Sequence, residues 1–166
     1  METITIMIYQ DEVYEEVAKS TDYTGAKLVD GDATARDRIL ATDADLATLG
    51  RFWDEAALAA NDRLKQMLIS GTTKQVTEEE EEGDATKLTT KTAYVVQLEV
   101  SKAYDKNLND SVAGSMKNFF IYSIIGQWFK FANKGEAGDY FTQAGDEITS
   151  AERMLYSRKR PKRPTV

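Results

Sequence analysis

The feature that most constrains the fold is an apolar segment near the end of the chain, residues 112–132. Its large side chains point to nearly every side of a helix: Phe119, Phe120, Ile121, Tyr122, Ile124, Ile125, Trp128, Phe129 and Phe131. A helix that is apolar all round is a buried one. Asn109 and Asp110 favour helix initiation just before it, and polar residues such as Lys117 and Lys130 interrupt it too often for a membrane span. The sequence therefore predicts a central, buried helix.

The next segment predicts a second helix that packs against the first. From Glu136 to Tyr156, apolar side chains step by four and three residues, which is the spacing of a helix seam. They are Ala137, Phe141, Ala144, Ile148, Ala151 and Leu155. The short connection at 133–135 makes the two helices antiparallel neighbours, and the small pairs Ala137-Gly138 and Ala144-Gly145 would let them approach closely.

The first half of the chain predicts further helices. Apolar residues recur at helical spacing after Asp11 and again within 33–41. A longer pattern begins at Leu46, behind Thr42 and Asp45 at the spacing of a capping box. Because this pattern continues for more than twenty residues, we expect its helix to end near Ser70-Gly71.

Residues 72–101 predict a β-hairpin in mid-chain. Tyr94, Val96, Leu98 and Val100 alternate with more polar residues, so Lys74–Glu80 and Lys87–Val100 are its expected arms. Its tip is acidic, with Glu78, Glu79, Glu80, Glu81, Glu82 and Asp84. The tip is either a flexible solvated loop or a surface that faces a basic partner. Thr3 to Tyr9 is either a short strand or a loosely packed extension.

The end of the chain is strongly basic. The whole chain carries 21 Lys and Arg against 28 Asp and Glu, a net charge of −7. Six of the cations, and none of the acids, lie between Arg153 and the end. The last of them belong to the stretch Arg158, Lys159, Arg160, Pro161, Lys162, Arg163 and Pro164. The prolines prevent a helix here. The stretch is an arm that docks on an acidic protein, a segment that contacts DNA, or a solubilising end.

Composition removes most catalytic chemistry. The chain has no cysteine and no histidine, which excludes Ser-His-Asp and Cys-His catalysis and the usual zinc sites. We therefore expect no enzyme activity, no catalytic residue, no metal site and no cofactor. The pairs Asp30/Asp32 and Asp43/Asp45 offer carboxylates for Mg²⁺ or Ca²⁺, but turns and caps already account for them. The N-terminus lacks the pattern of a signal peptide, and no membrane partner is expected.

These observations together predict a mainly α protein. The expected architecture is a single helical-bundle domain over residues 1–157, with the hairpin at about 72–101 as an excursion from it. Residues 158–166 form an extended basic C-terminal arm.

This pattern resembles a known family. The hairpin, the aromatic helix of the form Phe119-Phe120-Ile121-Tyr122-x-Ile124-Ile125-Gly126-x-Trp128-Phe129 and the basic ending are similar to the head–tail connector (adaptor or neck) proteins of tailed bacteriophages. The step Trp128-Phe129-Lys130, followed by Asn133-Lys134, Glu136-Ala137 and Tyr140, looks like their turn into the last helix. The resemblance covers roughly residues 33–166.

The resemblance implies a structural virion protein, assembled in the bacterial cytoplasm and located in the neck. Such proteins form a homo-oligomeric ring, commonly twelvefold, that docks on the portal protein and extends the DNA channel towards the tail. It implies that the arm grips the portal, the tail or another neck protein, and that the acidic hairpin tip contacts another subunit or docks the tail. Packaged DNA would pass without sequence-specific binding.

Two further hypotheses follow from the charges. The acidic tip of one subunit could meet the basic arm of the next, which is a head-to-tail contact of the kind that builds rings. The alternative function, from a different class, is a non-catalytic nucleic-acid-binding module that acts through the basic C-terminal arm.

Overall fold

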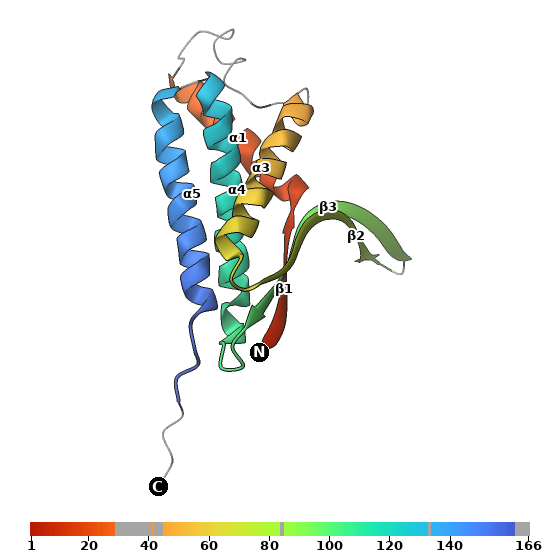
Figure 1. Ribbon diagram of the computed structural model, residues 1–166. Helices are drawn as coiled ribbons and strands as arrows, with labels where there is room; N and C mark the ends of the chain where they lie inside the picture. Colours follow the sequence, from red (N-terminus) through yellow and green to blue (C-terminus); the bar gives the residue numbers. More distant parts are fainter. Residues whose placement is uncertain (29–40, 42–44, 84, 133, 162–166) are drawn as a thin grey trace.

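The computed structural model describes residues 1–28, 41, 45–83, 85–132 and 134–161 and has a mixed α/β fold (Figure 1). In chain order the described elements are β1 (Glu2–Tyr9), α1 (Gln10–Leu28), α3 (Leu46–Leu64), β2 (Leu68–Glu82), β3 (Ala85–Val100), the 3₁₀ turn η2 (Lys106–Leu108), α4 (Asn109–Ala132) and α5 (Lys134–Leu155). The helices gather in one body, and the paired strands β2 and β3 leave it to one side.

The described strands form one antiparallel sheet in the order β1-β3-β2. Strand β1 pairs with the second half of β3, from Glu2 opposite Val100 to Tyr9 opposite Ala93. Strand β2 pairs with β3 along its whole length, as far as Glu82 opposite Ala85. The central strand, β3, is therefore the last of these three strands in the chain. The first strand, β1, pairs with β3 on the side away from β2.

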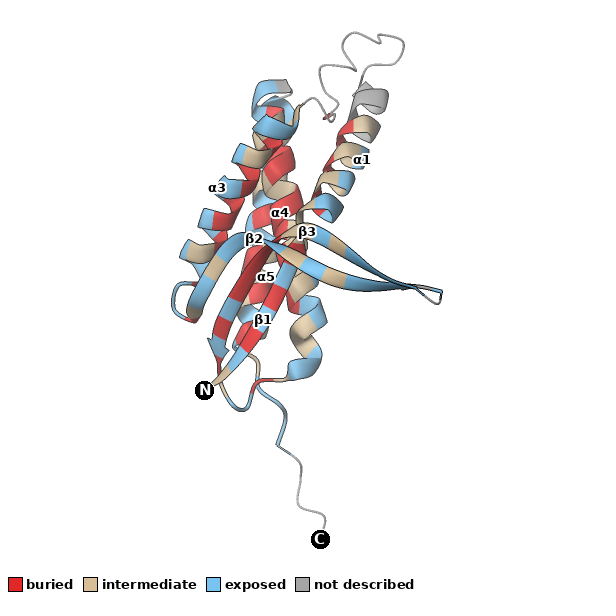
Figure 2. Ribbon diagram, turned by 90° about the vertical axis from the view of Figure 1, so that its right-hand side faces the viewer, coloured by how far each residue is buried: buried red, intermediate tan, exposed pale blue. Residues whose placement is uncertain are grey.

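One face of this sheet lies in the core because apolar residues alternate along its strands. The inner face is buried and consists of Ile4, Ile6, Ile8, Tyr94, Val96, Leu98 and Val100. Helix α3 contacts β2, α4 contacts β1, and α1 contacts β3. Figure 2 shows buried residues where the strands meet the helices and exposed residues along the outer hairpin.

Helix α4 is the centre of the helical part. It contacts α1, α3, α5 and β1, which explains why its sequence is apolar on nearly every side. It approaches α5 closely at Gly126, where an added Cβ atom would lie 2.9 Å from the Phe141 ring. By contrast, nothing lies within 4 Å of a Cβ at Gly138 or Gly145. The close approach that the sequence assigned to the small residues of α5 is therefore made by a glycine of α4.

Three buried aromatic rings join the helices to the sheet. The Phe120 ring centroid on α4 lies 4.6 Å from Trp53 of α3 and 5.1 Å from Tyr94 of β3. The Trp53 indole N–H donates to the Thr73 hydroxyl of β2 at 2.9 Å. The Tyr94 hydroxyl donates to Asn61 at 2.7 Å. The rings thus bury a large area while their polar atoms keep partners.

The prediction of a mainly α helical bundle is wrong. The fold is mixed α/β because β1 adds to the hairpin and completes a three-stranded antiparallel sheet. The half of β3 that follows Ala93 is the centre of this sheet, so the hairpin is not an excursion from a bundle. Of the two interpretations of residues 3–9, the strand is the one observed.

Several predicted boundaries also differ. Helix α3 ends at Leu64 instead of near Ser70-Gly71, because a turn at Leu64–Met67 leads directly into β2 at Leu68. Asp45 precedes α3 without a side-chain capping hydrogen bond, and Thr42 lies outside the described residues, as does the predicted helix 33–41 apart from Ala41. Asp30, Asp32 and Asp43 lie outside them as well.

The aromatic junction generates a stability prediction. Phe120→Ala should lower the free energy of unfolding by about 3–5 kcal/mol, because a fully buried ring leaves a cavity between two elements. Urea denaturation followed by circular dichroism measures this. The control is Leu58→Ala on α3, whose side chain is 69% exposed and whose loss should cost less than about 0.5 kcal/mol. Equal effects of the two changes would contradict the assigned core.

Candidate assembly surfaces: the acidic hairpin and the basic arm

The outer half of the hairpin projects from the body as a two-stranded ribbon. Strand β1 ends at Tyr9, opposite Ala93, so only β2 and β3 continue beyond that point. Both views show this part of the hairpin clear of the helices (Figures 1 and 2). Gly83 occupies the turn with φ 69°, a conformation that glycine adopts at no steric cost. The side chain of Leu88 is 67% exposed near the tip.

The glutamates are part of the ribbon and not of a loop. Residues 78–82 form the end of β2 and pair with residues 85–89 of β3, so the interpretation of a flexible acidic loop is wrong. Side chains alternate between the two faces of a strand. Glu78 and Glu80 therefore share a face with Lys91, while Glu79 and Glu81 lie exposed on the opposite face.

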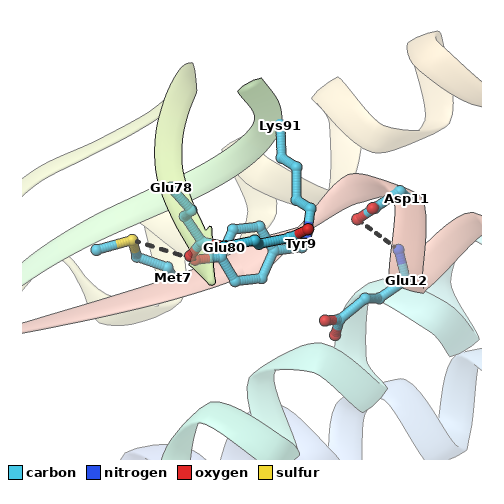
Figure 3. Close-up of polar contacts among 7 residues, drawn as sticks. All are labelled: Met7, Tyr9, Asp11, Glu12, Glu78, Glu80 and Lys91. Carbon is cyan, nitrogen blue, oxygen red and sulfur yellow. Dashed lines mark hydrogen bonds and ion pairs between the residues drawn. The ribbon is translucent and has the colours of Figure 1, made fainter. Parts of the chain in front are cut away.

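A polar cluster fixes the base of the ribbon (Figure 3). The Tyr9 hydroxyl, on the last residue of β1, donates a hydrogen bond to the carboxylate of Glu78 on β2. The Lys91 ammonium of β3 lies 5.8 Å from the centre of the Tyr9 ring, 3.2 Å from Glu80 and 3.8 Å from Glu78. The cluster links all three strands at the place where the sheet narrows from three strands to two.

The cluster changes the acidity of its members. The hydrogen bond to Glu78, partial burial and the negative charge of Glu78 together raise the pKa of Tyr9 to about 12. The hydrogen bond to Glu80 raises the pKa of Lys91 above its usual value. Both groups therefore keep their protons to a higher pH than a free tyrosine or lysine does.

The C-terminal arm is attached where it leaves α5. The Lys159 N–H donates to the Ala103 carbonyl at 2.8 Å, and Arg158 forms an isolated antiparallel bridge with Tyr104. The arm thus starts as a short segment held beside the β3–α4 connection by one bridge and one hydrogen bond. Of the predicted arm residues, Arg158, Lys159, Arg160 and Pro161 are exposed, and Lys162, Arg163 and Pro164 lie outside the described residues.

The acidic tip and the base of the arm are at different places on the molecule. The arm begins at the end of α5, whereas the ribbon leaves the side of the body (Figures 1 and 2). The structure therefore does not bring these two predicted sites together within one subunit. The side chain of Glu82 and the whole of Asp84 lie outside the described part of the chain.

An apolar groove of about 290 Å³ runs between α3, α4 and α5 over Phe52, Phe119 and Ile148. At its edges Arg63 pairs with Glu152 at 3.3 Å. Among the described residues, no three histidine, cysteine, aspartate or glutamate side chains are grouped so as to hold a metal ion. No helix in the described ranges is both long enough and apolar enough to cross a bilayer.

Comparison with family models, curated proteins and solved structures finds no match to this chain.

The residues that position these surfaces are partly ones that the sequence did not single out. Tyr9, Lys91 and the pair Ala103 and Tyr104 have no motif around them. Tyr9 alternates with the buried Ile8, which places it on the outer face once residues 2–9 are taken as a strand. Its contact with Glu78, 69 positions away, depends on the register of the sheet, and a local pattern does not contain that information.

The polar cluster generates a titration prediction. Glu78→Gln should lower the pKa of Tyr9 from about 12 towards 10, because the bond to the carboxylate is the first cause of the shift. The control is Glu79→Gln on the opposite face of the ribbon, which should leave the pKa of Tyr9 unchanged. Tyrosine ¹³Cζ chemical shifts against pH measure both variants, with Tyr9→Phe to assign the signal.

The same cluster sets a pH window for stability. Below pH 10 Tyr9 is protonated in the folded and the unfolded chain, so the bond contributes fully. Above pH 10 the unfolded chain ionises first, and the contribution is lost as the pH rises to about 12. A Tyr9 pKa that is identical in wild type and Glu78→Gln would contradict the assignment.

Proposed function

We propose that this chain is the subunit of an oligomeric head–tail connector ring in the neck of a tailed bacteriophage. In this role it docks on the portal protein and extends the DNA channel towards the tail. The observation that supports this proposal best is the projecting ribbon, which the subunit builds and holds in place without burying it. Its place in the virion, after assembly in the host cytoplasm, follows from the sequence resemblance.

The ribbon favours a structural role in an assembly. An isolated two-stranded hairpin is marginally stable in water, and free strand edges are templates for pairing with other chains. Here the Tyr9–Glu78 bond and the Lys91 ion pairs hold such a ribbon away from the body. A projection held at its base in this way is useful when another molecule packs on it.

The arm supplies a second contact of opposite charge. Arg158, Lys159 and Arg160 start from an anchored position and are exposed, so their charges are available to an acidic partner surface. We assign this surface to the portal, the tail or another neck protein. The excess of acidic residues in the rest of the chain disfavours DNA as the main partner and suits a channel through which DNA slides.

Ring assembly is the first test. Light scattering and electron microscopy of the purified chain should show a closed ring with a central opening. Replacing both Glu79 and Glu81 with Lys should weaken ring assembly about tenfold or more at low salt, because the ribbon then loses most of the negative charge that attracts a basic surface of the next subunit. Glu78 and Glu80 keep their bonds to Tyr9 and Lys91, so the ribbon itself should persist.

A matched control changes the charge by the same amount elsewhere. Asp139 and Asp146 are exposed on α5, and replacing both with Lys should leave assembly unchanged. A ring that resists the ribbon variant in low salt, or one that is lost equally in the control, would count against the assigned contact.

The arm is tested by truncation. A chain that ends at Ser157 should still form the ring. The full chain and this truncated chain are used as paired baits in lysate of the phage-producing cell, and bound proteins are eluted with rising salt and identified by mass spectrometry. The full chain should retain the portal or a tail protein, and the truncated chain should not. Retention of the same partner by the truncated chain would remove the arm from this role.

The alternative is a nucleic-acid-binding module, favoured by the exposed cations of the arm. It predicts that a monomer binds duplex DNA with an affinity that falls steeply with salt, and that truncation at Ser157 abolishes this binding. The ring proposal predicts weak binding to duplex DNA, with or without the arm. Fluorescence anisotropy at several salt concentrations distinguishes the two functions.

A further inference from the structure

The ribbon has two free backbone edges, and they differ in charge. Strand β2 is an outer strand of the sheet along its whole length. Strand β3 is covered by β1 only from Ala93 to Val100, so residues 85–92 have β2 on one side and nothing from the described sheet on the other. Each free edge carries backbone N–H and C=O groups that another strand can pair with.

The space beside β3 is open. A hollow of about 290 Å³ reaches Thr90, Lys91 and Thr92 between the ribbon and the first turns of α1. Nearer the tip, residues 85–88 are exposed and Leu88 is 67% exposed. A strand from outside can therefore approach the edge of β3 at residues 85–88, and the hollow leaves space beside residues 90–92.

The charges select one of the three possible edge pairings. Pairing β2 with β2 of a second copy would place glutamates 78–82 against glutamates, and like charges across a strand pair are unfavourable. Pairing β3 with β3 would place Lys87 and Lys91 against lysines. Pairing β3 with β2 brings lysines to glutamates, as Lys91 already does with Glu78 and Glu80 within one ribbon.

We propose that the ribbon of each subunit pairs edge to edge with that of the next, the free edge of β3 (residues 85–92) receiving the outer edge of β2 from a second copy. This inference rests on the ring assembly proposed above and names its contact. Ribbons that point the same way place β3 antiparallel to the incoming β2, which is the direction of pairing within the sheet. The contact is head-to-tail, so repetition closes a ring of strands with no free edge.

The pairing also assigns the two faces of the ribbon. On one face the glutamates meet Lys87 and Lys91 and are neutralised in part. On the other, Glu79 and Glu81 have Leu88 and Thr86 opposite them and keep their charge. A closed ring of ribbons therefore has one face that is more acidic than the other, and this face suits the wall of a channel that DNA passes without adhering.

Disulfide cross-linking tests the pairing directly, because the chain has no cysteine of its own. One preparation carries Glu79→Cys on β2. A second, with a distinguishing tag, carries Thr86→Cys, Leu88→Cys or Thr90→Cys on β3. These β3 positions share the face of Glu79 and span the registers that a tilted ring of strands allows. The two preparations are mixed, oxidised and separated by mass.

The expected result is a mixed disulfide between the two preparations for at least one β3 position, and little disulfide when either is oxidised alone. The matched control pairs Glu79→Cys with Leu58→Cys on α3. The side chain of Leu58 is as exposed as that of Leu88, and this pair should give no mixed product. Circular dichroism checks that every variant is folded, and light scattering of the same samples reports whether rings are present.

Each other outcome overturns the inference. Rings without a mixed disulfide would reject the ribbon contact and leave the connector proposal standing. Disulfides formed only between identical variants would show a two-fold contact in place of a head-to-tail one. A chain that stays monomeric and forms no disulfide at any concentration tested would reject both the contact and self-assembly into a ring.

Discussion

The contact of Phe120 with Trp53 and Tyr94 is the interaction on which the rest of the structure depends. It is the place where α3, α4 and β3 meet, and it lies in the buried core. The burial of apolar side chains such as these is the main favourable contribution to folding. Since β3 is the central strand, the contact also fixes where the sheet sits on the helices, and through β3 it sets the direction in which the ribbon leaves the body.

Strand β3 has two parts with different roles, one in the core and one in the ribbon. They meet at Ala93, where β1 ends at Tyr9. Beyond Ala93 it is covered by strands on both sides and by helices on its inner face. Before Ala93 it is one half of a ribbon with exposed side chains. The cluster of Tyr9, Glu78 and Lys91 lies at this boundary and links the three-stranded part of the sheet to the two-stranded ribbon. A stable core thereby supports a surface that remains available for other molecules.

The helices could be read from the sequence because their signals are local. The all-round apolar pattern of α4 and the seam of α5 depend on residues three and four apart, and the structure places both helices where the pattern predicts them. The fold class could not be read in this way. It depends on the pairing of Glu2–Tyr9 with Ala93–Val100, and a short run such as Thr3–Tyr9 gives no indication of a partner so far along the chain. The contact between Glu78 and Tyr9 could not be predicted for the same reason.

The sheet has a consequence for synthesis. Ile4, Ile6 and Ile8 leave the ribosome well before the partners with which they pair, Leu98, Val96 and Tyr94. At about 5–20 residues per second, roughly 90 further residues take about 5–20 seconds to make. For that time the N-terminal strand is an apolar segment without its sheet, which makes it a natural binding site for a nascent-chain chaperone and the place where aggregation would begin if production outpaced folding.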